Sequence, residues 1–141
     1  MSKKIHTLQF SDKNEFDEKV DNLLGIGCEL LENTYEVIKN DDGVIYSQVI
    51  EYDTKKTDIR FYNNGQIDIM GMLDKDGKQV GLYTRWYENG KKQFEGTYKN
   101  GKKDGLFTWW YGNGKKEYEG TYKNGKKFSI KEWNEDGSFK E

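Results

Sequence analysis

Apolar residues at positions 81–128 fall in short runs rich in aromatic side chains and threonine, without the 3.6-residue period of a helix. The runs at 82–87 and 93–98 flank the segment Glu88-Asn89-Gly90-Lys91. Aromatic and β-branched residues favour strands, and Asn-Gly tolerates the positive φ of a tight turn. This pattern predicts a β-hairpin.

The hairpin is repeated. Residues 81–104 and 105–128 have the same 24-residue pattern, and the block EGTYKNGKK begins at both Glu95 and Glu119. Weaker copies begin upstream at Phe61 and downstream at Trp133. The chain therefore contains about three and a half hairpin units with degenerate ends, as expected for a stack of repeats.

The N-terminal residues follow another pattern. Alternation over 4–10 predicts a strand, and Asp12 with Glu15 three residues later predicts a capped helix start. Strands are predicted over 28–38 and 44–52. The predicted helix carries one apolar stripe, formed by Phe16, Val20, Leu23 and Leu24.

A short polar hinge at 53–57 divides the chain into two parts. The first, residues 1–57, is a β-α-β-β module, and the second, residues 58–141, is a repeat sheet. Because the strand predicted at 44–52 leads directly into the repeats, we expect the two parts to share one continuous sheet.

The repeat motif carries a family resemblance. Residues 94–105 read FEGTYKNGKKDG, and residues 118–125 read YEGTYKNG, with Ser129 in place of the closing glycine. These motifs resemble the MORN repeat, and more closely the bacterial MORN-repeat variant proteins, over residues of about 59 to 141. The resemblance implies an elongated single-layer sheet used as a scaffold or binding surface. Some bacterial members are labelled antitoxins, and lipid binding has been claimed for others.

The predicted fold class is therefore α+β, mostly β. An N-terminal β-α-β-β module continues into an elongated single-layer antiparallel β-meander of MORN-like hairpins. Only 33% of residues are hydrophobic but 15% are aromatic, so large rings must build much of the core.

Composition also bears on the setting. The lone Cys28 excludes an intrachain disulfide and fits a reducing compartment. The start has no apolar leader and no run reaches membrane-spanning length, so we expect a cytoplasmic protein. Frequent Lys, Asn, Ile, Tyr and Phe suit an AT-rich bacterial or phage genome. No cofactor is expected.

The two parts carry opposite charge. Residues 1–58 hold 7 Lys and 13 acids, a net of −6, whereas residues 59–141 have a net of +4. This asymmetry fits an intramolecular attraction, a head-to-tail attraction between copies in a homo-oligomer, or a basic partner for the N-terminal part. Two solvated surfaces that merely differ are an equally good interpretation.

The turn at 88–91 permits two registers, which differ in the faces that the strands present. A bulge at Gly90 gives one uniformly apolar face, and we prefer it. That face comprises Leu82, Trp86, Phe94, Tyr98, Leu106, Trp110, Tyr118 and Tyr122. The opposite, wet face then carries six predicted partner-binding residues: Tyr83, Arg85, Tyr87, Phe107, Trp109 and Tyr111. Exposed aromatics with an arginine are typical of interface hot spots, although a ladder that only stiffens the sheet is the alternative.

Lysine rows at the turns are candidate phosphate-binding residues. Solvated lysines that protect sheet edges from aggregation are the competing interpretation. The candidates are Lys91, Lys92, Lys102, Lys103, Lys115, Lys116, Lys126 and Lys127. With His6 and Cys28 as the only histidine and cysteine, we predict neither a metal site nor a catalytic dyad.

The sequence favours a non-enzymatic protein-protein interaction module that binds through exposed aromatics of the repeat sheet. Its expected setting is that of an antitoxin-like or phage-encoded inhibitor of a bacterial protein. The alternative is peripheral binding to anionic lipid or nucleic-acid phosphates through the turn lysines.

Overall fold

The computed structural model describes residues 3–31, 35–41 and 43–141. Its N-terminal part consists of β1 (Lys3–Phe10), α1 (Lys13–Gly25), β2 (Glu29–Leu30), β3 (Glu36–Asn40) and β4 (Gly43–Asp53). The strand predicted over 28–38 is two short strands instead, and part of the segment between them lies outside the described residues. β4 is central and pairs antiparallel with β1, β2 and β3.

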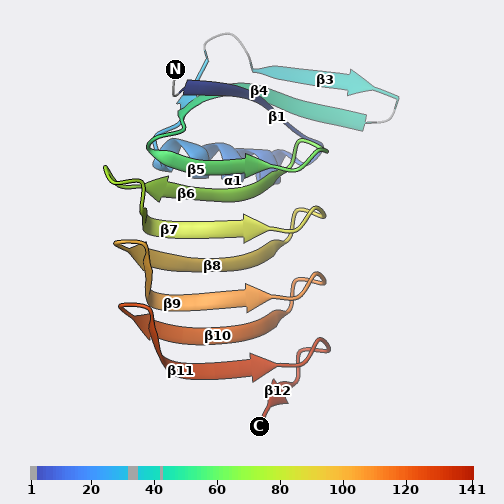
Figure 1. Cartoon of the computed structure of the whole chain (residues 1–141). Helices are drawn as coiled ribbons and strands as arrows, with labels where there is room; N and C mark the ends of the chain where they lie inside the picture. Colours follow the sequence, from blue (N-terminus) through green and yellow to red (C-terminus); the bar gives the residue numbers. More distant parts are fainter. Residues whose placement is uncertain (1–2, 32–34, 42) are drawn as a thin grey trace.

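An eight-stranded antiparallel sheet follows, in which each strand pairs with its neighbours in chain order (Figure 1). Its strands are β5 (Thr57–Phe61), β6 (Ile67–Leu73), β7 (Gln79–Trp86), β8 (Lys92–Lys99), β9 (Lys102–Trp110), β10 (Lys116–Lys123), β11 (Lys126–Trp133) and β12 (Phe139–Lys140). The predicted fold class, mostly β with a long β-meander after an N-terminal α/β module, is confirmed.

The expectation of one continuous sheet is wrong, because β4 and β5 belong to different sheets. β4 pairs with β1 on one edge and with β2 and β3 on the other, so no edge is left for β5. The Asp53 carbonyl accepts from the Lys56 amide at 3.1 Å and from the Thr57 hydroxyl at 2.7 Å. This tight turn reverses the chain before β5 begins.

Helix α1 begins where the sequence predicts. The Asp12 side chain accepts a hydrogen bond from the Glu15 amide at 2.8 Å, which satisfies one of the free donors of the first turn. The helix packs Phe16 and Leu23 into a core that also contains Met70 and Trp86 of the repeat sheet. The core is therefore shared between the N-terminal part and the first repeats.

Two kinds of turn alternate from β7 onward. In the β7–β8 turn, the Tyr87 amide donates to the Lys91 carbonyl at 2.9 Å, and Gly90 has φ +82°. This is a three-residue loop with a glycine bulge. The β8–β9 turn is a two-residue loop in which Asn100 and Gly101 both have positive φ. The hairpin assignment made from the Asn-Gly pairs is confirmed.

The predicted faces of the hairpins are wrong for β8 and β10. A first shift, at the glycine bulge, aligns Trp86 with Lys92. A second shift leaves Gln93 out of the ladder and aligns Arg85 with Phe94. Two one-residue shifts cancel, so β8 presents Phe94 on the Arg85 side of the sheet. The β9–β10 hairpin contains the same double shift.

The sheet therefore has one face that is mainly aromatic. We call it the aromatic face, and its ring-bearing members are Tyr83, Phe94, Tyr98, Phe107, Trp109, Tyr118 and Tyr122. The opposite face carries Leu82, Trp86, Leu106 and Trp110. Helix α1 lies behind β5 and β6 (Figure 1) and packs on this face, so we call it the helix face. Beyond the reach of α1 this second face is open to solvent, and Leu106 is 54% exposed.

Candidate partner-binding surface

Glycine lets the aromatic face pack without a second layer. A Cβ placed on Gly96 would lie 2.3 Å from the Phe107 ring, and one on Gly71 would lie 2.4 Å from the Tyr83 ring. The rings therefore rest directly on the backbone of the neighbouring strand. This close approach buries Phe107 completely and leaves Tyr83 1% exposed, although no second sheet of the described residues covers them.

The rings form a continuous cluster around Phe107. Tyr98 and Tyr122 meet Phe107 edge to face, with ring centroids 5.2 and 5.3 Å apart, and Trp109 lies 5.6 Å away. Tyr118 continues the cluster, 4.7 Å from Trp109. Such offset and perpendicular contacts suit the quadrupoles of aromatic rings. Around the buried Phe107, these four rings keep part of their surface accessible.

A lysine already lies against this cluster. The Nζ atom of Lys103 is 4.5 Å from the Trp109 ring centroid, 5.0 Å from that of Phe107 and 4.9 Å from that of Tyr122. These distances are within the range of cation–π attraction. The rings of the aromatic face thus have the position and orientation needed to bind a cation.

A shallow hollow of about 270 Å³ opens at the end of the cluster, lined by Trp109, Glu117, Tyr118 and Tyr122. The two tyrosine hydroxyls lie 2.8 Å apart. Burial, the hydrogen bond to Tyr122 and the negative charge of Glu132 raise the pKa of Tyr118 to about 12. The walls of the hollow therefore combine two phenols, an indole and a carboxyl group.

Three of the predicted binding residues contribute rings to the aromatic face, but two of these rings are buried. Tyr83 and Phe107 were predicted to be exposed, and this is wrong because each ring fits over a glycine of the neighbouring strand. Trp109 keeps part of its surface accessible. As predicted, it points to the opposite face from Trp110.

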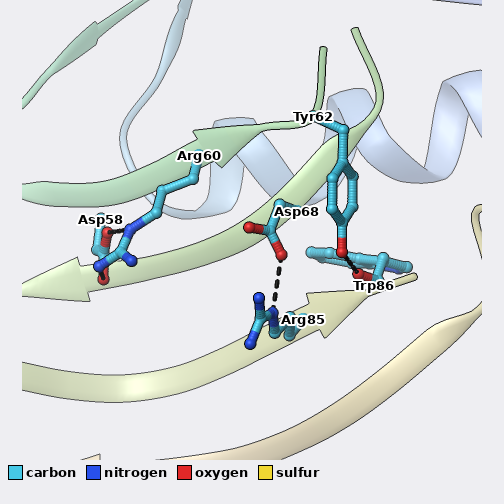
Figure 2. Close-up of polar contacts among 6 residues, drawn as sticks. All are labelled: Asp58, Arg60, Tyr62, Asp68, Arg85 and Trp86. Atoms are coloured by element: carbon cyan, nitrogen blue, oxygen red, sulfur yellow. Dashed lines mark hydrogen bonds and ion pairs between the residues drawn. The ribbon is translucent and has the colours of Figure 1, made fainter. Parts of the chain in front are cut away.

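The other three predicted binding residues have partners within the sheet. The Tyr87 and Tyr111 hydroxyls donate to the carbonyls of Trp110 and Trp133, each at 2.8 Å. These bonds join each turn to the next, and Figure 2 shows the first of the series, from Tyr62 to Trp86, at 2.6 Å.

Arg85 pairs with Asp68 across β6 and β7 (Figure 2). Its Nε atom lies 2.8 Å from Asp68 Oδ1. The hydrogen bond to this carboxylate raises the pKa of Arg85 above its ordinary value. Arg85 thus forms an ion pair within the chain, at the β6–β7 end of the aromatic face.

Sequence reasoning missed four accessible rings, which it placed in the core stripe. They are Phe94, Tyr98, Tyr118 and Tyr122. Their true face depends on the second register shift, and the residues that bulge there, Gln93 and Glu117, have no turn-forming character. The spacing Tyr118-x-Gly120-x-Tyr122, with rings flanking a glycine on one side of a strand, is the signal that indicates this packing.

The candidate phosphate-binding lysines are mostly engaged. Lys91 and Lys115 each donate to a carbonyl of the next turn, at 3.0 and 2.6 Å. Lys92 and Lys116 each pair with the glutamate three residues later, at 2.8 and 2.7 Å. Lys103 lies on the aromatic cluster. The remaining three are exposed: Lys102, Lys126 and Lys127.

Another hollow, of about 440 Å³, lies where the N-terminal part meets the first repeat. Three of its charged groups pair with one another, since Lys3 Nζ lies 2.5 Å from Glu51 Oε2 and 3.8 Å from Glu29 Oε2. Among the described residues, its lining contains one ring, that of Tyr52. We place the candidate site on the aromatic face because there the polar and aromatic groups converge on accessible space.

The lone histidine and cysteine have structural surroundings. His6 stacks on Phe61 with ring centroids 3.5 Å apart, and burial lowers its pKa. Cys28 is 4% exposed, and burial raises the pKa of its thiol to about 11. Within residues 3–31, 35–41 and 43–141, no three His, Cys, Asp or Glu side chains cluster as metal ligands do.

The fold and surface define a β-meander repeat protein with one mainly aromatic face. The family model described as MORN repeat variant matches residues 79–100 and 103–124, which are the β7–β8 and β9–β10 hairpins. These hairpins are MORN repeats of the variant type, as the sequence motifs predicted. MORN repeats generally serve to bind proteins or membrane lipids and not to catalyse reactions.

No curated protein and no solved structure gave a match to the chain. None of the helical segments among the described residues is long and apolar enough to cross a membrane.

Proposed function

We propose that this chain is a non-enzymatic protein-binding module whose contact surface is the accessible part of the aromatic face. The observation that carries the proposal is the contiguous cluster of partly accessible rings around Trp109, with a hollow at its end. Trp and Tyr anchors with little side-chain entropy to lose dominate the energetics of protein interfaces. A face that has no covering layer and is rich in such rings fits a partner protein.

The competing function, binding to phosphates of anionic lipid or nucleic acid, rests on the turn lysines. Four of the eight already donate to carbonyl or carboxylate oxygens of the chain. Each would have to give up an internal acceptor to bind a phosphate, which weakens the net gain. The phosphate-binding alternative therefore rests on Lys102, Lys126 and Lys127, which are exposed.

As the biological setting of this binding, we propose an antitoxin-like or phage-encoded inhibitor of a bacterial protein, acting in the cytoplasm. The family resemblance and the compositional bias support this setting. It requires a stable complex with one bacterial protein and loss of that protein's activity on binding.

Affinity capture from bacterial lysate, read by mass spectrometry, tests the proposed class. The expected result is a protein captured by the wild type and by Leu106→Ala but lost with Trp109→Ala. Leu106 is the matched control because it is an exposed apolar residue of the same strand on the opposite face. Capture should persist at raised salt, because apolar contacts are not screened.

Binding to vesicles of phosphatidylcholine with phosphatidylglycerol tests the phosphate-binding alternative. If vesicle binding is tight, falls steeply with salt and is lost on changing Lys102, Lys126 and Lys127 to Gln, the phosphate-binding alternative replaces the proposal.

A further inference from the structure

The β5–β6, β7–β8 and β9–β10 hairpins contain the same register shift, so equivalent positions along the aromatic face can be compared. We call these hairpins, each taken with the strand that follows it, the first, second and third units. In each case one residue bulges out of the ladder beside a paired residue of the next strand. In the first unit the bulged residue is Asp68, and Arg85 of the next strand stands across from Ile69. The guanidinium of Arg85 therefore lies beside the Asp68 carboxylate, with Nε and Oδ1 2.8 Å apart (Figure 2).

The second unit replaces this ion pair with neutral groups. Gln93 takes the bulged position, and Trp109 stands in the place of Arg85, across from Phe94. The ring centroid of Trp109 lies 6.1 Å from that of Phe94.

The third unit contains two acids. Glu117 takes the bulged position, and Glu132 stands in the place of Arg85, across from Tyr118. Within the described part of the chain, Glu117 has no ion-pair partner. Like charges placed at neighbouring cross-strand positions are destabilising. At the two positions that Asp68 and Arg85 take in the first unit, the third unit thus has two carboxylates.

The surroundings of the two acids suit a cation. Glu117 lines the hollow together with Trp109, Tyr118 and Tyr122. Rings at the wall of a hollow attract cations through their π faces, and a carboxylate at its rim adds a charge-assisted hydrogen bond. A planar guanidinium can stack on an indole and donate to a carboxylate at the same time.

Two lysines lie nearby, and neither fills the hollow. Lys103 Nζ lies over the Trp109 ring at 4.5 Å. Lys140 Nζ lies 4.0 Å from Glu132 Oε2, at the limit of an ion pair, on a side chain that is 43% exposed. Lys116, the neighbour of Glu117 in sequence, pairs with Glu119 instead.

We propose that the hollow at Trp109, Glu117, Tyr118 and Tyr122 binds the arginine side chain of a partner protein. The arginine takes the role that Arg85 takes beside Asp68, with Glu117 and Glu132 as its acceptors and the rings as its walls. The inference rests on the proposed protein-binding function and specifies the group that the partner presents.

The test uses two small probes that differ in charge but little in shape, N-acetylarginine amide and N-acetylcitrulline amide. Each is titrated into the full chain while the indole N–H signal of Trp109 is followed by NMR. The arginine probe is expected to bind about tenfold more tightly than the citrulline probe. Glu117→Gln should remove this preference, and Glu88→Gln, the same charge change at an exposed turn, should keep it.

A second variant supplies a guanidinium to the hollow from the chain itself. Glu132→Arg puts a guanidinium where Arg85 stands in the first unit, beside Glu117. We expect it to raise the melting temperature and to abolish the response of Trp109 to the arginine probe. The amide spectrum of the variant establishes that it is folded before the titration begins.

Equal binding of the two probes, or an unchanged response in both Glu117→Gln and Glu132→Arg, overturns the inference. That outcome leaves the proposed function intact if Trp109→Ala still loses the captured partner. If Trp109→Ala retains the partner while the arginine preference is observed, the hollow is a cation site and the proposed protein-binding surface is wrong.

Discussion

At the scale of single residues, glycine determines how closely the rings of the aromatic face approach the backbone. Gly96 and Gly71 leave the space that Phe107 and Tyr83 occupy. Both glycines lie within strands and have no positive φ, so what matters at these positions is the missing side chain. Gly120 differs, because the nearest atom to an added Cβ is the Tyr118 hydroxyl, at the end of a side chain that can move.

Gly96→Val is therefore expected to be more damaging than Gly120→Val. A valine at Gly96 collides with the completely buried Phe107 ring, and overpacking of this kind costs about 1–3 kcal/mol of unfolding free energy. At Gly120 the phenol tip can move aside, so a smaller loss is expected. Urea denaturation of both variants measures the difference, and equal losses would mean that ring-to-glycine packing is not what stabilises this face.

Lys19 makes the stability of the helix contact depend on pH. It is 4% exposed, and its Nζ lies 3.5 Å from the Trp86 ring centroid. Burial lowers its pKa from 10.5 to about 8, against the opposing attraction of Glu18 and Glu15. The ring face also favours the charged form, but desolvation outweighs it.

Because this pKa is lowered on folding, the unfolded chain binds more protons between about pH 8 and pH 10.5. Stability should rise with pH across that window, by about 1–2 kcal/mol between pH 7 and pH 9.5. Lys19→Met, which keeps the apolar stem, should lose the rise and be more stable at pH 7. Denaturation curves of both proteins at the two pH values measure this, and a parallel rise in Lys19→Met would assign it to other groups.

At the scale of elements, the sequence predicted the hairpins and the helix start but not the faces of the strands. The Asn-Gly turns and the Asp12 cap are local, and their chemistry can be read from a few neighbouring residues. The face of β8 depends on whether the number of register shifts is odd or even. The first shift is marked by Gly90, whereas the second falls at Gln93, a residue without turn-forming character.

The helix cap gives the prediction at this scale. Asp12→Ala removes the acceptor of the Glu15 amide and should cost about 1 kcal/mol of unfolding free energy. Because α1 packs on the first repeats, the loss should appear in the cooperative unfolding of the whole chain and not only in the helix signal. Circular dichroism and tryptophan fluorescence followed together in urea measure it. Asp12→Asn, which keeps a capping oxygen, should retain most of the stability, and an equal loss in this variant would contradict the capping role.

At the scale of the whole molecule, the sequence predicted the long meander but not its separation from the N-terminal sheet. Continuity along the chain from the strand predicted at 44–52 suggested one sheet, but strand pairing across the sequence decides which edges are used. β1 and β2–β3 occupy both edges of β4, and no local pattern marks that competition. The acidic N-terminal part then packs through α1 on the helix face, which leaves the aromatic face of the more basic repeats accessible.

The central claim is that the aromatic face binds a partner protein, and the affinity of the captured protein tests it most directly. Isothermal titration of that purified protein into wild type, Trp109→Ala and Leu106→Ala gives three dissociation constants. The account predicts a loss of at least about 30-fold for Trp109→Ala, as for an interface hot spot. It predicts a change of less than about threefold for Leu106→Ala, with both variants folded. A large loss for Leu106→Ala with no loss for Trp109→Ala would contradict the account and place the partner on the helix face.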